Sequence, residues 1–151
     1  MLGIYMILAL FVEGAAWVAA LVLRWTGSPD PWMIGARVGW GRVTLPPSPR
    51  RVWVHGASLG EVGLMKSLEP ALRARGLETV ATAASASGVK ALALILPGSW
   101  TGVLPLDSPL AARRFLDRMA PRALILLETE IWPSLILAAS SRGVSVLFAN
   151  G

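Results

Sequence analysis

The sequence contains no cysteine and a single histidine, His55, among its 151 residues. The absence of cysteine excludes disulfides, thiolate metal sites and a cysteine nucleophile, and a lone imidazole excludes a histidine-rich metal centre. Charged residues are also scarce, at 15% of the chain against about 25% in a typical soluble domain. Because 54% of the residues are hydrophobic, a disordered chain is excluded and a purely soluble protein is not favoured.

The chain is long enough for one domain with at most a short appendage. It carries 14 basic and 9 acidic residues, for a formal net charge of +5. This balance fits an anionic partner, whether a phosphate-bearing substrate, an acidic lipid or nucleic acid. A composition bias of the genome would produce the same excess of arginine.

A long apolar run, LGIYMILALFVEGAAWVAALVL, occupies residues 2–23 and contains one charge, Glu13. About 20 such residues suffice for a membrane-spanning helix. Arg24 and Trp25 follow as an interfacial pair, and further arginines lie beyond them. By the positive-inside rule, the body of the protein is expected in the cytoplasm and the N-terminus on the far side.

Two alternatives to a spanning anchor stay open. A cleaved signal peptide needs a basic leading region, which the printed sequence lacks. Glu13 would cost about 2–4 kcal/mol at mid-membrane, which favours a helix that lies partly in the interface.

The chain is therefore divided into a membrane-anchor helix (1–25), a linker (26–50) and a folded domain (51–151). The prolines and glycines of the linker exclude long regular elements. Trp25, at the end of the anchor segment, and Trp32 and Trp40, in the linker, suit a segment that lies against lipid headgroups; packing on the domain is the alternative for Trp40.

From residue 51 onward, β-rich runs alternate with amphipathic segments. The expected strands are residues 51–55, 78–83, 102–106, 122–127 and 144–148, and the expected helices are 61–75, 87–96, 109–119 and 131–142. Strands that are apolar without alternation, separated by helices, are typical of a parallel sheet covered on both faces. The expected fold class is α/β: a Rossmann-like parallel sheet preceded by the anchor helix.

Ligands of such sheets bind beyond the carboxyl ends of the strands. The first loop there, HGASLGE at residues 55–61, has glycines that let the backbone approach a ligand, and a following helix start that favours an anion. Its spacing is neither the dinucleotide fingerprint nor a Walker A loop. Glu61 has two interpretations: a carboxylate that complements the helix dipole, or a general base that takes a proton from a hydroxyl.

A second concentration of polar groups is ETEIWP, at residues 128–133. Glu128 and Glu130 follow a strand that must be buried, and acidic residues at such a strand tip favour a functional role. Asp107 is a third candidate, although Asp-Ser-Pro is also an ordinary helix-capping sequence. Ser85 and Ser87 either hydrogen-bond a ligand or are turn residues.

Four segments resemble the N-terminal half of the 3-deoxy-D-manno-octulosonic acid (Kdo) transferases of lipopolysaccharide synthesis. They are VWVHGASLGEV (52–62), LPLDSPLAARRFL (104–116), PRALILLETEIWPSLI (121–136) and VSVLFAN (144–150). Their order and spacing match the family along nearly the whole chain, and SxGE followed by ETExWP is the specific part. The apolar N-terminus also resembles the membrane anchor of that family.

The resemblance implies the N-terminal half of a GT-B glycosyltransferase, in which two Rossmann-like domains face each other across a cleft. Such enzymes transfer Kdo from CMP-Kdo to a hydroxyl of a lipid A precursor, with inversion of the anomeric centre and without a metal or cofactor. Glu61 would be the general base for the acceptor hydroxyl. The expected substrate-binding residues are Ser58, Gly60, Ser85, Ser87, Asp107, Glu128 and Glu130.

The sequence departs from the family pattern in three places. The family continues with Asn-x-Arg-x-Ser where this sequence ends at Asn150-Gly151, and the donor-binding domain is outside it. The loop over residues 83–88 has fewer hydroxyls and no proline, and Gly56 replaces a larger residue. We therefore expect this chain to supply the acceptor-binding half, to meet CMP-Kdo through a missing donor domain, and to be inactive alone.

The alternative is an inactive, membrane-tethered lipid-binding module or a truncated remnant. Arginines that otherwise form solvated helix faces would bind anionic lipid; they are Arg73, Arg75, Arg113, Arg114 and Arg118. Nucleic acid is not an expected partner, because these arginines are not interleaved with aromatic residues. The expected location is the inner membrane, with a single N-terminal anchor and a cytoplasmic globular part.

Overall fold

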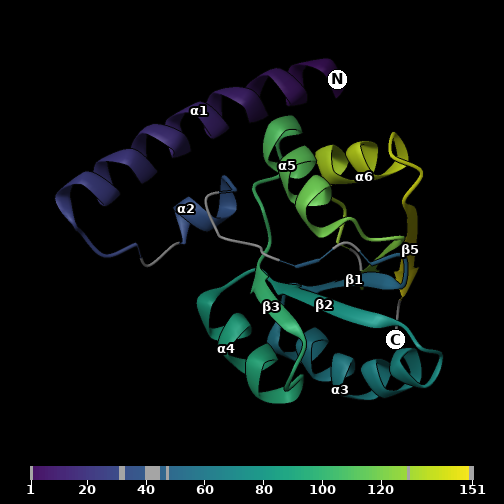
Figure 1. Cartoon of the computed structure of the whole chain (residues 1–151). Helices are drawn as coiled ribbons and strands as arrows, with labels where there is room; N and C mark the ends of the chain where they lie inside the picture. The colour runs from purple at the N-terminus through teal and green to yellow at the C-terminus, as the bar shows by residue number, and fades with distance from the viewer. Residues whose placement is uncertain (1, 31–32, 40–44, 47, 129, 150–151) are drawn as a thin grey trace.

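The computed structural model describes residues 2–30, 33–39, 45–46, 48–128 and 130–149, and shows a parallel sheet between helices with one long helix beside it (Figure 1). The strands are β1 (Arg51–Gly56), β2 (Glu78–Ala83), β3 (Trp100–Val103), β4 (Ala123–Leu127) and β5 (Ser145–Ala149). The helices of the folded domain are α3 (Leu59–Ala74), α4 (Ala86–Ile95), α5 (Pro109–Met119) and α6 (Pro133–Ser140). They are preceded by α1 (Leu2–Thr26) and the short α2 (Ile34–Arg37).

The strand order is β3-β2-β1-β4-β5, and every neighbouring pair is parallel. The central strand β1 pairs with β2 on one side and β4 on the other, so Val54 stands opposite both Ala81 and Ile125. The predicted parallel α/β sheet is confirmed. The direction of winding reverses between β1 and β4, and ligands of open α/β sheets bind at such a switch point. The loops that follow these two strands carry SxGE and ETExWP.

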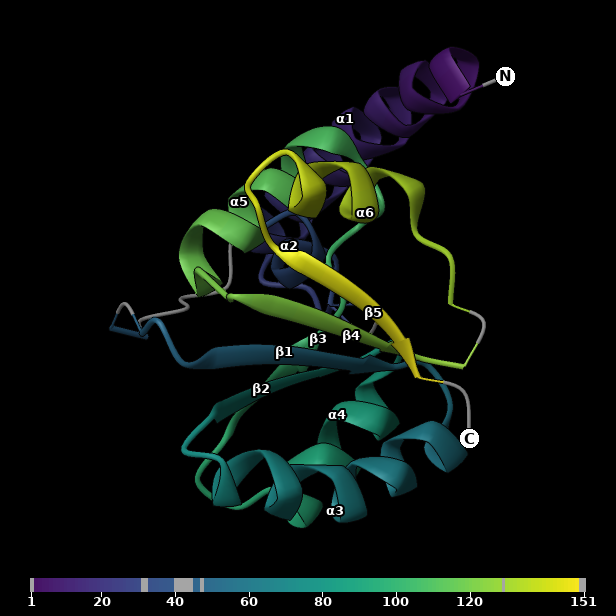
Figure 2. The same cartoon turned by 90° about the vertical axis from the view of Figure 1, so that its right-hand side faces the viewer.

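Helices cover both faces of the sheet: α3 and α4 lie on one face, α5 and α6 on the other (Figure 2). On the α5–α6 side, the fully buried Trp53 packs against Phe115 with ring centroids 4.5 Å apart. On the α3–α4 side, Val54 packs with Val62 and Met65. All six residues of β1 are buried, which explains why its sequence shows no alternation of polar and apolar residues.

The boundary of β3 differs from the prediction. We expected a strand over residues 102–106, whereas β3 is Trp100–Val103. The chain leaves the sheet there, because the Leu106 N–H donates to the carbonyl of Arg37 in α2. The linker thus takes part in the fold through the short helix α2, and those of its residues that the structure describes form no long element. Trp25, near the end of α1, is 93% exposed, and Trp32 and Trp40 of the linker lie outside the described residues.

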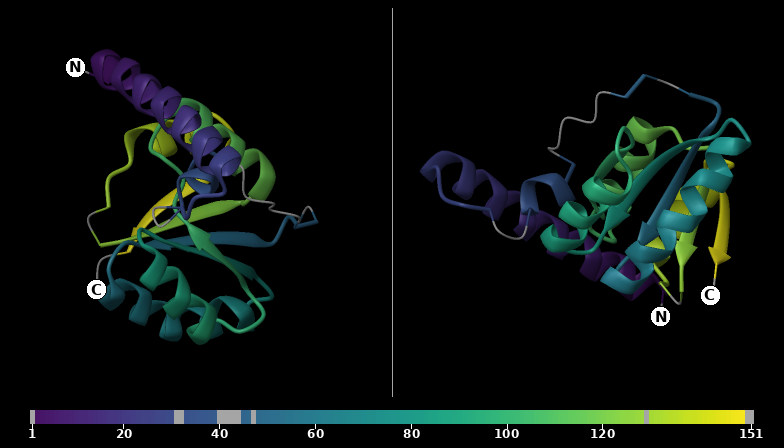
Figure 3. Two further views of the ribbon diagram at one scale, coloured as in Figure 1. Left: turned by 90° about the vertical axis from the view of Figure 1, so that its left-hand side faces the viewer. Right: turned by 90° about the horizontal axis from the view of Figure 1, so that it is seen from below.

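Helix α1 is long and apolar enough to cross a membrane, by length and composition. It also contacts α2 and α5 (Figure 3), and Glu13 is buried in that contact. The Glu13 carboxylate accepts hydrogen bonds from the Ser108 hydroxyl at 2.6 Å and from Arg114 Nη1 at 3.0 Å. The charge that would be costly in a membrane is therefore paired with the folded domain, and a spanning anchor stays a prediction.

Candidate functional site

Glu61 lies in the first turn of α3, directly after the loop that follows β1. Its carboxylate oxygens accept hydrogen bonds from the Ala57 N–H at 2.7 Å and the Ser58 hydroxyl at 2.8 Å. In return, the Glu61 N–H donates to Ser58 Oγ at 3.2 Å. This reciprocal arrangement is a variant of the capping box, in which the carboxylate accepts from the Ala57 N–H in place of the N–H of the N-cap residue Ser58. It leaves lone pairs on both carboxylate oxygens, so a cap and a general base are compatible roles.

Gly56 allows Glu61 to lie close to the end of β1. A Cβ at Gly56 would stand 3.0 Å from the Cβ of Glu61 and 3.1 Å from Cε of Met65. The small residue at this position therefore sets how closely the general-base candidate approaches the sheet. At Gly60 a Cβ would meet only Ser58 Oγ, at 3.7 Å, and its predicted part in binding stays a prediction.

His55 is fully buried at the carboxyl end of β1. Its Nδ1 lies 3.0 Å from the hydroxyl and 3.1 Å from the carbonyl of Thr82, and Trp53 Nε1 donates to the same hydroxyl. Burial lowers the pKa of His55 to about 4, against the opposing effects of the Thr82 hydrogen bond and the Glu61 charge. The imidazole is therefore neutral at pH 7.

The two glutamates of ETExWP differ in the contacts that the structure gives: backbone contacts for Glu128 and a side-chain contact for Glu130. The backbone at Glu128 is left-handed (φ 57°), and its N–H donates to the carbonyl of Ala149 at the end of β5. Glu130 lies with Oε2 at 3.9 Å from His55 Nε2, a contact that is not an ion pair while the imidazole is neutral. Trp132 stands edge-on to the His55 ring, with centroids 6.1 Å apart.

Two buried nitrogens at this point have no hydrogen-bond partner among the residues that the structure describes: His55 Nε2 and Trp132 Nε1. Buried polar atoms ordinarily have partners, so these two nitrogens, together with Glu130, make the switch point the candidate site. Sequence reasoning did not select His55 for function. The signal was its position, as the only histidine, at a strand end directly before SxGE.

Ser85, Ser87 and Asp107 have structural partners. Ser85 caps α4, because its Oγ accepts from the Gly88 N–H at 3.1 Å and lies 3.0 Å from Ser87 Oγ. The Asp107 carboxylate accepts from the Ser134 and Leu135 N–H groups at 3.3 and 2.9 Å, so it caps α6 rather than its own helix. Their parts in substrate binding stay predictions.

Arg37 is a cation at this edge that sequence reasoning placed only in the linker. Its guanidinium donates to the carbonyls of Ala84, after β2, and of Leu104, after β3. Burial lowers its pKa, which the charge of Asp30 partly offsets. The linker therefore brings a positive charge to the carboxyl ends of two strands.

The arginines of the lipid-binding alternative do not share one surface. Arg73 and Arg75 lie at the end of α3, whereas Arg113, Arg114 and Arg118 lie on α5, across the sheet. Of these, Arg73 pairs with Glu69, Arg114 pairs with Glu13, and Arg118 donates to the carbonyl of Gly39.

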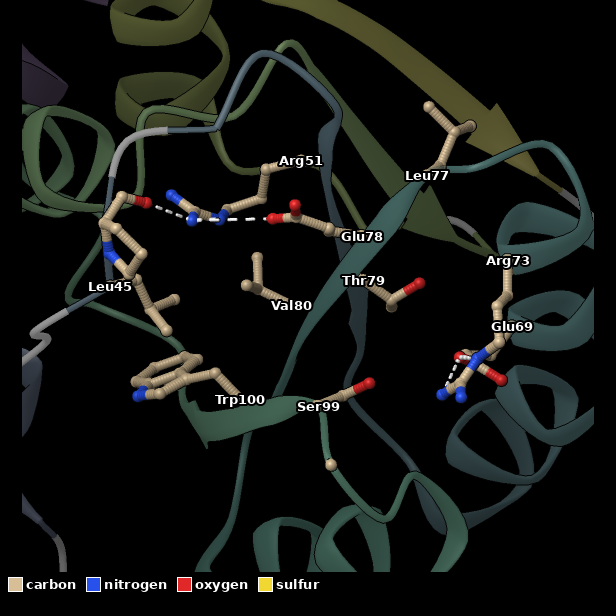
Figure 4. Close-up of a pocket in the computed structure, with 12 residues that line it drawn as sticks. Leu45, Arg51, Glu69, Arg73, Leu77, Glu78, Thr79, Val80, Ser99 and Trp100 are labelled. Atoms are coloured by element: carbon tan, nitrogen blue, oxygen red, sulfur yellow. Dashed lines mark hydrogen bonds and ion pairs between the residues drawn. The ribbon is translucent and has the colours of Figure 1, made fainter.

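A hollow of about 450 Å³ lies at the opposite, amino-terminal edge of the strands (Figure 4). Its charged side chains pair with each other: Arg51 with Glu78 at 3.7 Å, and Arg73 with Glu69 at 2.6 Å. Strand carboxyl ends, not amino ends, carry the ligand sites of these sheets. In the part of the chain that is described, no three metal-binding side chains come together.

Comparison with known proteins points to one family. The family model for 3-deoxy-D-manno-octulosonic-acid transferase (kdotransferase) matches residues 33–151. The chain is 41% identical to the 3-deoxy-D-manno-octulosonic acid transferase of Bordetella pertussis over 129 residues, 79% of this chain and 30% of that protein. It is 30% identical to the transferase of Haemophilus influenzae over 115 residues, 74% of this chain and 26% of that protein.

A mitochondrial protein of Arabidopsis thaliana, named as a probable 3-deoxy-D-manno-octulosonic acid transferase, is 39% identical over 98 residues. These cover 59% of this chain and 21% of the plant protein. The chain thus spans less than a third of the length of each of these relatives. With both family motifs at the switch point of the sheet and a match that runs from residue 33 to residue 151, the chain belongs to the Kdo transferase family.

Proposed function

We propose that this chain is the acceptor-side half of a GT-B glycosyltransferase that transfers Kdo from CMP-Kdo to a lipid A precursor. The observation that carries the proposal is the meeting of SxGE and ETExWP where the winding reverses between β1 and β4. CMP-Kdo is assigned to a second Rossmann-like domain outside this sequence. The relatives, which are named as Kdo transferases and extend well beyond the matched part, support this division.

In the proposed reaction, Glu61 takes the proton of an acceptor hydroxyl as its oxygen attacks the anomeric carbon of Kdo. The new carbon–oxygen bond forms on the face opposite CMP, and CMP leaves with the electron pair of the broken bond, so the anomeric centre inverts. A base must be held within hydrogen-bond reach of the proton it removes. The hydrogen bonds from Ala57 and Ser58 supply this orientation for Glu61.

The acceptor sugar is proposed to lie over the polar group beside β4. Glu130 would accept a hydrogen bond from one of its hydroxyls. His55 Nε2 and Trp132 Nε1 lack partners among the described residues but are buried, so they would complete the contacts only if binding of the sugar opens the surface above them. This side of the reaction uses no metal and no cofactor.

Attachment to the inner membrane through α1, with the globular part in the cytoplasm, brings the site to a lipid acceptor. The support is the apolar surface of α1, on which Phe11 is 73% and Ile4 is 66% exposed. An acceptor with acyl chains is presented only at such a surface.

The test is Kdo transfer to a lipid A precursor in vesicles, with CMP-Kdo as donor and the lipid mass as readout. The chain is assayed alone and with a separately expressed donor domain of a relative. Glu61→Gln is compared with Glu69→Gln, the same change on the same helix away from the site. We expect product only in the mixture, lost in Glu61→Gln and retained in Glu69→Gln.

Product from Glu61→Gln would overturn the general base, and product from the chain alone would overturn the division between two domains. If no arm gives product, the inactive lipid-binding module becomes the better description. Salt-sensitive binding to anionic vesicles that ignores Glu61→Gln would then support it.

A further inference from the structure

Helix α1 shields one face against the domain and leaves most of its large apolar side chains exposed on the rest of its surface. The shielded positions recur every three or four residues along one face and include Met6, Ala9, Glu13, Trp17 and Ala20. The exposed large side chains are Leu2, Ile4, Tyr5, Ile7, Leu8, Leu10, Phe11, Val12, Val18, Leu21, Val22 and Trp25. A helix at the surface of a water-soluble domain has the opposite arrangement, so the environment expected outside α1 is apolar.

The shielded face is fixed to the domain by specific polar contacts. Glu13, Ser108 and Arg114 form what we call the latch, in which the 2%-exposed Glu13 accepts both hydrogen bonds. The Arg114 guanidinium also lies 4.9 Å from the centroid of the Trp17 ring. Nearer the N-terminus, the Tyr5 hydroxyl donates to the Asp107 carboxylate.

These contacts conflict with a helix that crosses the bilayer. From Tyr5 to Ala20, the docked stretch is about 22 Å long at 1.5 Å per residue, against a hydrocarbon core of about 30 Å. If α1 spanned the membrane while docked, Arg114 and Asp107 would have to enter the hydrocarbon. If it spanned undocked, Glu13 would stand in the hydrocarbon without its partners, which is costly.

We propose that α1 lies in the plane of the membrane surface, held to α5 by the latch, with its large apolar face in the acyl chains of an anionic bilayer. Charge complementarity selects this partner, because an exposed cation lies near each end of the helix. Arg24 is in its last turn, and Arg113 lines a shallow groove together with Met6. In-plane helices combine such an apolar face with basic residues that contact lipid headgroups.

The orientation also places the membrane beside the candidate site, a consequence that rests on the proposed function. Tyr5 contacts Asp107 in the loop after β3, and Met6 Sδ lies 3.5 Å from Ser134 Oγ at the start of α6. Both partners belong to the carboxyl edge of the sheet. A lipid acceptor therefore keeps its acyl chains in the layer that holds α1 while its sugar reaches this edge.

Depth measurements along α1 test the proposal. Because the sequence has no cysteine, Ile4→Cys, Phe11→Cys and Val18→Cys each carry a single label. These positions are seven residues apart, on the outward face. The labelled full chain is added to vesicles that contain phosphatidylglycerol, and quenching by lipids with spin labels at known depths is measured. An in-plane helix gives the same shallow depth at all three positions.

A spanning helix gives a depth profile with Phe11→Cys deepest, roughly 10 Å below the other two by helix rise, and this result overturns the proposal. Absence of lipid quenching at all three positions also overturns it, because a second protein surface would then cover the face. Neither readout depends on turnover, so a failed transfer assay leaves the test intact.

The latch is tested in the same vesicles by Glu13→Leu, with Glu13→Gln as the matched control. Leucine removes the charge and the hydrogen bonds, so we expect the profile to change to that of a spanning helix. Glutamine retains an acceptor for the Ser108 hydroxyl, and the flat profile should persist. A flat profile in Glu13→Leu would show that the latch does not determine the orientation.

Discussion

Ser58 and Glu61 bind each other through both side chains and one backbone N–H, at distances of 2.8 and 3.2 Å. The same two residues define the SxGE motif of the family. The motif is therefore a helix cap as well as a site element, and the cap holds the carboxylate at the end of β1. Substitutions in this motif should therefore have two separable effects, one on the stability of the fold and one on the transfer of Kdo.

The first prediction concerns the cap. Ser58→Ala removes the acceptor for the Glu61 N–H and the donor to its carboxylate, and we expect the free energy of unfolding to fall by about 1 kcal/mol. Ser58→Thr keeps the hydroxyl and should lose less than half of that. Urea unfolding in detergent measures both variants, and an equal loss in the two would contradict the role of the hydroxyl.

The spacing of hydrophobic residues and the positions of glycine and proline were enough to predict the sheet and its helices. A sheet buried on both faces requires apolar strands and amphipathic helices, and both are visible in the sequence. Local capping signals were less reliable. Asp-Ser-Pro at residues 107–109 predicts the start of α5 correctly, with Ser108 at the N-cap position, but neither side chain caps α5: Asp107 caps α6 and Ser108 binds Glu13. These partners lie 27 or more residues away in sequence, and no local pattern contains them.

In the candidate site, too, features that depend on local sequence could be predicted, and features that depend on contacts between distant residues could not. Glu61 and Glu130 could be selected because their motifs are local and follow strands. His55 could not be distinguished from a core residue, since its unpartnered nitrogen results from the packing of β1 against β2 and from the position of Trp132. Arg37 reaches the site only because the linker folds back onto the strand ends.

The second prediction compares two glycines. A Cβ at Gly88 would lie 2.7 Å from the Cβ of Ala83, where α4 begins against the end of β2. We expect Gly88→Ala to lower the free energy of unfolding by about 1–3 kcal/mol through overpacking. Gly63→Ala, in the second turn of α3, where the added Cβ meets nothing within 4 Å beyond its own stretch of helix backbone, should raise it by about 0.5–1 kcal/mol. Unfolding midpoints that move in the same direction would refute this account.

The third prediction concerns Asp107. Its carboxylate accepts from two N–H groups at the start of α6, so Asp107→Ala should lower the free energy of unfolding by about 1–2 kcal/mol. Asp117→Ala is the matched control, because Asp117 is exposed and makes a surface pair with Arg142 at 2.7 Å. The control should cost less than about 1 kcal/mol. If both variants lose the same stability, Asp107 is not acting as the cap of α6.

The fourth prediction is a dependence of stability on pH that comes from His55. Burial lowers its pKa in the folded chain to about 4, below the ordinary histidine value of 6.5. Between these values the unfolded chain binds a proton that the folded chain does not, so stability must fall as the pH falls. The full contribution is present above pH 6.5, and the loss reaches about 3 kcal/mol near pH 4 at 1.36 kcal/mol per unit.

Because His55 is the only histidine, its imidazole signals in an NMR titration report this pKa directly. Urea unfolding across the same range gives the slope, and His55→Asn provides the comparison. The asparagine does not titrate, so the part of the slope between pH 6.5 and 4.5 should disappear whatever the variant's absolute stability. Carboxylates titrate in both proteins, so their contribution cancels when one slope is subtracted from the other. A titration near pH 6.5, or a slope unchanged in His55→Asn, would show that the imidazole is not held neutral by burial.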